Sequence, residues 1–131
     1  MSAMQKHAWY YLAVVTLTAC TVLALFPLMG VAAHGGFGLL GLLGFGPLFL
    51  RKKKGDVVAD ERDTLIQRRS VILGYSVLWL VFVGGSCLAP LWYGMDGSVP
   101  VVTIVAFPWY ATVFFIGVMS VATLVQYNRG A

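Results

Sequence analysis

Two long stretches of the chain, residues 7–50 and 70–128, contain no charged side chain apart from Asp96. Each is far longer than the roughly 20 apolar residues that a helix needs to cross a bilayer core of about 30 Å. Hydrophobic residues make up 60% of the 131 positions and charged residues only 11%, and a soluble domain of this size cannot bury so much apolar surface. The pattern predicts an integral membrane domain and excludes a soluble enzyme, a disordered tail or a DNA-binding domain.

Each uncharged stretch contains one turn signal. In the first stretch, Pro27-Leu28-Met29-Gly30 is followed by His34-Gly35-Gly36, and the second divides at the polar run 94–100. We therefore predict a single all-α domain over residues 1–131, a four-helix transmembrane bundle built from two antiparallel hairpins. The expected spans are about 8–28, 35–50, 70–93 and 100–127, the second of them short enough that it could begin near Val31.

The basic residues predict an orientation in the membrane. Seven of the nine Lys and Arg residues lie within 51–70, and the other two, Lys6 and Arg129, lie near the chain ends. With four spans, the cytoplasmic loop 51–69 and both termini share one side, and the opposite loops carry no basic residue. Since Lys and Arg mark cytoplasmic loops, we expect a multi-pass protein of the cytoplasmic (inner) membrane with both termini in the cytoplasm.

A cleaved signal peptide is the competing interpretation of the first span. Lys6 would form its basic region, and Val31-Ala32-Ala33 resembles a small-residue cleavage site. The apolar stretch is longer than the usual 7–15 residues, so we favour a retained helix.

The single polar segment offers both a structural and a functional interpretation. Asp60 suits a helix N-cap, with Glu61 and Asp63 in the first turn, and this helix is expected to project into the cytoplasm before it enters the third span. In the structural interpretation, these charges cap the helix and pair with the preceding basic run. In the functional one, they dock anionic lipid head groups or a protein partner. The candidate docking residues are Arg51, Lys52, Lys53, Lys54, Asp60, Glu61, Arg62, Asp63, Arg68 and Arg69.

Small residues at helical spacing predict where the membrane helices approach one another, because close backbone contact drives association in lipid. Glycines of the second span recur every third residue, which on an α-helix drifts about 60° per step and gives a wrapped surface rather than one stripe. The predicted packing residues are Thr16, Cys20, Ala24, Gly38, Gly41, Gly85 and Ala89. Cys20 and Cys87 are expected to be small buried residues.

No residue pattern indicates catalysis, a cofactor or a metal. No ionisable residue lies deep in a predicted span, and His7 and His34 are expected near opposite membrane faces. Gly36-Phe37-Gly38-Leu39-Leu40-Gly41 fits GxGxxG, but it lies in a span and lacks the strand that this motif requires. We therefore expect no enzyme, no cofactor and no nucleic-acid partner.

Asp60-Glu61-Arg62-Asp63, followed by Ile66 and Arg69 at the entry to a span, resembles a family of small predicted membrane proteins of unknown function. The closing segment 120–130 also resembles the bacterial members. The resemblance implies a four-helix protein of the cytoplasmic membrane without assigned catalysis. Members are often encoded beside small helix-turn-helix regulators, which suggests a sensing or accessory role.

These observations favour a non-catalytic accessory or regulatory subunit that works as a homo-oligomer or with a membrane or cytoplasmic protein. The alternative is a small oligomeric channel or transporter, suggested by the glycines of the second span and by Pro108 in the fourth. A lipid-modifying enzyme ranks below both, since only the acids at 60–63 offer a general base.

Overall fold

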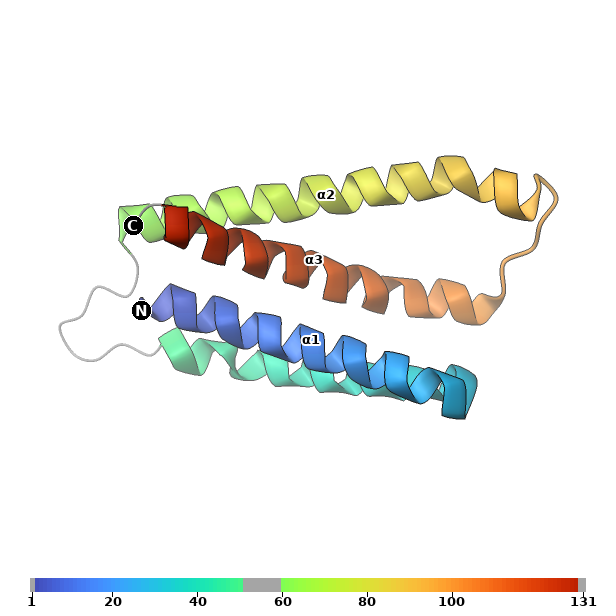
Figure 1. Ribbon diagram of the computed structural model, residues 1–131, viewed down its shortest axis with the longest axis horizontal. Coiled ribbons are helices and arrows are strands. Elements are labelled where there is room, and N and C mark those ends of the chain that lie inside the picture. Colours follow the sequence, from blue (N-terminus) through green and yellow to red (C-terminus); the bar gives the residue numbers. More distant parts are fainter. Residues whose placement is uncertain (1, 51–59, 130–131) are drawn as a thin grey trace.

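A computed structural model describes residues 2–50 and 60–129 of the chain, all of them helical apart from short connections. The elements are α1 (Ala3–Met29), η1 (Gly30–Leu50), α2 (Glu61–Tyr93) and α3 (Val101–Arg129). Figure 1 shows an elongated bundle in which η1 returns alongside α1, and α3 returns alongside α2. Both chain ends and the start of α2 lie at the same end of the bundle.

The prediction of a four-helix transmembrane bundle is wrong. The described residues form three α-helices, and residues 30–50 form a 3₁₀ helix of 21 residues in place of the second one. Three helical stretches, rather than four, are long and apolar enough to span a membrane: Ala3–Leu48, Glu61–Leu91 and Val101–Arg129. The first of them contains the reversal at Gly30, where φ is +56°. These properties are those of a membrane protein.

The spacing of the glycines explains the 3₁₀ helix. A 3₁₀ helix has three residues per turn, so residues three apart eclipse one another. Gly35, Gly38, Gly41 and Gly44 therefore form one straight ridge, and a Cβ added at any of them would meet no atom within 4 Å. We call these four residues the glycine ridge. The expected 60° drift is wrong because it assumed α-helical geometry.

The register between η1 and α1 in the structure agrees with this geometry. A Cβ on Gly36 would lie 3.0 Å from Val22 Cγ2, and one on Gly46 would lie 2.8 Å from both His7 Nε2 and the Tyr11 hydroxyl. The ten residue steps from Gly36 to Gly46 thus run alongside about thirteen residue steps of α1, from Val22 to a level between His7 and Tyr11. Ten residues rise about 20 Å in a 3₁₀ helix, as thirteen do in an α-helix, whereas ten α-helical residues would rise only about 15 Å.

The core lies where α1, η1 and α3 meet. Val15, Val22, Phe37 and Leu40 are buried together, and Val113 and Ile116 of α3 are among the side chains packed against them. In addition, the Tyr10 hydroxyl of α1 donates a hydrogen bond of 2.6 Å to the Leu42 carbonyl of η1. This side-chain contact fixes the two segments in one register.

Helix α2 is the least buried element. It begins at Glu61 after the N-cap Asp60, as predicted, and runs for 33 residues, or about 50 Å. Its main neighbour is α3, whose Phe115 ring lies over Gly74. From Trp79 onward, no α2 side chain that the structure describes is buried, and Figure 1 shows α2 and α3 separating toward that end.

A polar contact in the middle of its first half also ties α2 to α3. The Gln126 amide donates a hydrogen bond of 2.9 Å to Ser70 Oγ, and Ser70 is fully buried. Replacing Ser70 with alanine is expected to lower the free energy of unfolding in detergent by about 1 kcal/mol, because the bond is lost and the amide is left one partner short. Ser76→Ala, at an exposed position of the same helix, is the matched control. Equal stability of the two variants would contradict this role.

Candidate functional site

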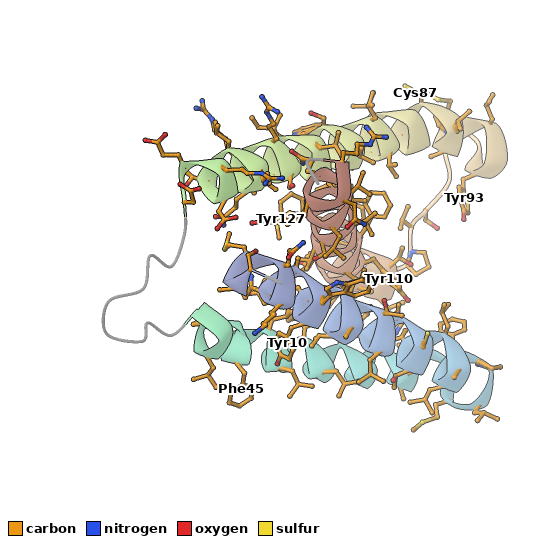
Figure 2. The ribbon with its side chains drawn as sticks, turned by 60° about the vertical axis from the view of Figure 1, so that its left-hand side comes forward. Tyr10, Phe45, Cys87, Tyr93, Tyr110 and Tyr127 are labelled. Carbon is orange, nitrogen blue, oxygen red and sulfur yellow. The ribbon has the colours of Figure 1, made fainter. Side chains whose placement is uncertain are left out.

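Three helix ends meet where the two chain termini lie. Met4 of α1, Ile66 of α2 and Tyr127 of α3 form a buried cluster, with exposed fractions of only 7–8%. In Figure 2, Tyr127 lies on the last turns of α3, close to the first turns of α2. We call this part of the bundle, with residues 60–69, the polar end.

Two of the predicted docking acids are used inside the fold. Asp60 accepts a hydrogen bond of 2.7 Å from the Glu61 amide, and Asp63 accepts one from the Asp60 amide, which completes a capping box. The Tyr127 hydroxyl also donates to Asp63 Oδ1. Asp60 and Asp63 therefore start α2 and fasten it to α3, which is the structural interpretation of these two residues.

The other charged residues of the polar end point away from the fold. Glu61, Arg62, Arg68 and Arg69 are all exposed. At 100° per residue, Glu61, Leu65 and Arg68 share one face of α2, opposite the buried Ile66 and Ser70. Within residues 2–50 and 60–129, none of these four charged side chains forms an ion pair. The predicted docking residues Arg51, Lys52, Lys53 and Lys54 lie outside the described residues.

A second cluster lies toward the opposite end of the bundle, around His34. The His34 Nδ1 atom lies 2.7 Å from the Val31 carbonyl, which can only accept, so Nδ1 is the donor. Nε2 lies 3.2 Å from the Tyr110 hydroxyl and shares a hydrogen bond with it. Phe37 meets the Tyr110 ring edge to face at 4.9 Å and stacks with Trp109 at 6.3 Å.

Sequence reasoning did not identify this cluster, and it placed His34 at the interface without a partner. The contact joins residues 76 positions apart, and no local pattern indicates it. His7 instead contacts Tyr11 beside Gly46, with ring centroids 4.1 Å apart and ring planes tilted by 43°. The two histidines therefore lie at different levels of the bundle. Among the described residues, no three His, Cys, Asp or Glu side chains gather as a metal site.

Several apolar grooves lie between the described helices, and three of them hold about 600 Å³ or more. One of about 600 Å³ lies between α1 and α3, one of about 600 Å³ between α2 and α3, and one of about 640 Å³ between the glycine ridge and α3. No charged side chain lines any of them.

The predicted packing residues all lie on exposed surface, and most line these grooves. Their role in packing stays a prediction. The expectation that both cysteines are buried is wrong, since Cys20 and Cys87 are exposed; Figure 2 shows Cys87 on the outer side of α2. The residues lining a groove are Thr16, Cys20, Gly38, Gly41, Gly85 and Ala89, and the remaining one is Ala24.

Neither a family model nor a curated protein nor a solved structure matches the chain. The resemblance carried by Asp60-Glu61-Arg62-Asp63 stays an expectation. Function is therefore argued from the geometry of the polar end and of the grooves.

Proposed function

We propose that this protein is a non-catalytic accessory or regulatory subunit of the cytoplasmic (inner) membrane. It docks a partner through the polar end, which faces the cytoplasm together with both termini. The observation that carries the proposal is the exposed face of Glu61, Leu65 and Arg68, whose two charged side chains form no ion pair within the described residues. Charged side chains on a rim give an interface its orientation and its choice of partner.

The length of α2 supports this assignment. At about 50 Å it exceeds a bilayer core by about 20 Å, so its charged first turns extend beyond the lipid. Leu65, 54% exposed between Glu61 and Arg68, adds an apolar centre to the charged face. A basic run beside a span also attracts anionic lipid head groups at about 1 kcal/mol per residue.

A charge swap tests the proposal without altering net charge. The double variant Glu61→Lys/Arg68→Glu is expected to reduce recovery of a co-purifying protein about tenfold, because both charge contacts reverse. Stability should fall by at most about 1 kcal/mol, because neither side chain bonds within the described part of the fold and only the favourable negative charge in the first turn of α2 is lost. Glu61→Asp/Arg68→Lys is the matched control. An unaltered partner set from the swapped variant would contradict protein docking, and loss of bound anionic lipid alone would assign the site to lipid.

A small oligomeric channel or transporter is the second candidate. The glycine ridge supports it, because four open glycines offer a flat surface that copies of the chain can arrange around a path. Flux of ions and small solutes into liposomes that hold the purified protein tests this candidate. Absence of flux in the same preparation that retains its protein partner favours the docking role.

A further inference from the structure

The length of η1 depends on whether its residues form a 3₁₀ helix or an α-helix. As a 3₁₀ helix its 21 residues extend about 42 Å, close to the roughly 40 Å of α1 and the 43 Å of α3. As an α-helix the same residues would extend about 32 Å, close to the thickness of a bilayer core. Runs of 3₁₀ helix beyond three or four residues are uncommon because their hydrogen bonds are poorer. The α form is therefore a near competitor.

Besides the apolar core at Phe37 and Leu40, three specific contacts hold η1 in the longer form. The Tyr10 hydroxyl bonds the Leu42 carbonyl, and His34 bonds Tyr110. Gly46 provides the third contact, packed against Tyr11 and His7. A Cβ added along the glycine ridge would meet no described atom within 4 Å, so conversion would not break a tightly packed surface on that side.

The sequence of η1 suits both forms. Ala33, Phe37 and Leu40 are buried in the 3₁₀ form. On an α-helix, these three residues and Gly44 would lie within about 60° of one another around the helix axis. An α-helical η1 would keep the same buried trio and turn Gly44, rather than Gly46, toward α1. Each form thus has a glycine at the position of close approach.

We propose that η1 converts between the 3₁₀ and the α form, and that bilayer thickness sets the balance. A thick bilayer favours the long form and a thin one the short form, because mismatch between an apolar segment and the lipid carries a cost. Conversion draws Leu48 about 9 Å toward the Gly30 turn, at about 0.5 Å per residue. Partial conversion turns the middle residues away from α1, so the two forms are discrete. This inference goes beyond the docking role and does not depend on it.

Distances between spin labels test the conversion. Labels at Leu28→Cys and Leu48→Cys occupy exposed positions, 81% and 57%, in a chain whose exposed Cys20 and Cys87 are replaced by alanine. We expect the long distance in nanodiscs of dierucoyl phosphatidylcholine. In dimyristoleoyl phosphatidylcholine a second population about 9 Å shorter should dominate.

Alanine variants separate the helix type from other motions. Gly35→Ala/Gly38→Ala/Gly41→Ala meets no steric obstacle in the 3₁₀ form, leaves Gly44 in place for the close approach of the α form, and raises α-helical propensity, so it should enrich the short population in both lipids. Gly84→Ala, an equally open site in α2, is the control and should leave the distance unchanged. A label pair at Leu23→Cys and Val121→Cys reports α1 against α3 and should stay constant. One invariant distance in both lipids and all variants overturns the proposal, as does a shift that is independent of lipid thickness.

Discussion

Gly46→Leu is expected to lower the free energy of unfolding by about 3 kcal/mol, the upper part of the range for overpacking a tight contact. Any side chain at this position meets the Tyr11 ring, and its Cβ would lie 2.8 Å from His7 Nε2. Gly46 is buried and the two rings belong to one α-helical face, so the backbones of η1 and α1 must separate. The change should also weaken the nearby bond between the Tyr10 hydroxyl and the Leu42 carbonyl.

Gly44→Leu provides the matched comparison, because it lies on the same segment two residues away and a Cβ there meets nothing within 4 Å. Unfolding both variants by titration with a denaturing detergent, followed by circular dichroism, measures the difference. Equal stability of the two would show that η1 does not lie against α1 in the described register.

The second large effect is expected at the contact between Asp63 and Tyr127. Tyr127→Phe should lower the free energy of unfolding by about 2 kcal/mol, since a hydrogen bond to a charged group contributes about 1.5–3 kcal/mol. Tyr127 is only 8% exposed, within the cluster that joins α1, α2 and α3, and its hydroxyl donates to Asp63 Oδ1. The loss should therefore loosen the polar end as a whole.

A double-mutant cycle isolates this bond from the capping role of Asp63. Asp63→Ala removes both the acceptor of Tyr127 and the capping box, whereas Asp63→Ala/Tyr127→Phe should be little worse than Asp63→Ala alone. Tyr75→Phe, at a 56% exposed position of α2, is the control and should be neutral. Additive losses at Asp63 and Tyr127 would contradict a direct interaction.

Local sequence patterns predicted the start of α2 correctly. Asp60 as the N-cap, with Asp63 three residues later, depends only on spacing along the chain, and capping is a local interaction. The partner of Asp63 was not predictable in the same way, because Tyr127 is 64 residues away. Asp63 bonds within the fold, whereas Arg68 is exposed. This difference depends on which face of α2 packs against α3, and the local sequence pattern does not show it.

The helix type of residues 30–50 was not predicted, although its signal is present. Glycines at 35, 38, 41 and 44 recur with a period of three, and α-helical geometry was assumed for them. The choice between the two helix types depends on the register against Val22, Tyr11 and His7 of α1. That register depends on tertiary contacts. The three-residue period alone therefore did not distinguish a 3₁₀ helix from an α-helix.

The eclipsed geometry of η1 constrains how its length can change. Adding or removing one residue would turn everything beyond it by a third of a revolution, and Phe37 or Leu40 would exchange places with a glycine. Only changes in multiples of three preserve both faces, each triplet altering the reach by about 6 Å. Tolerated insertions and deletions in this segment are therefore expected in steps of three residues.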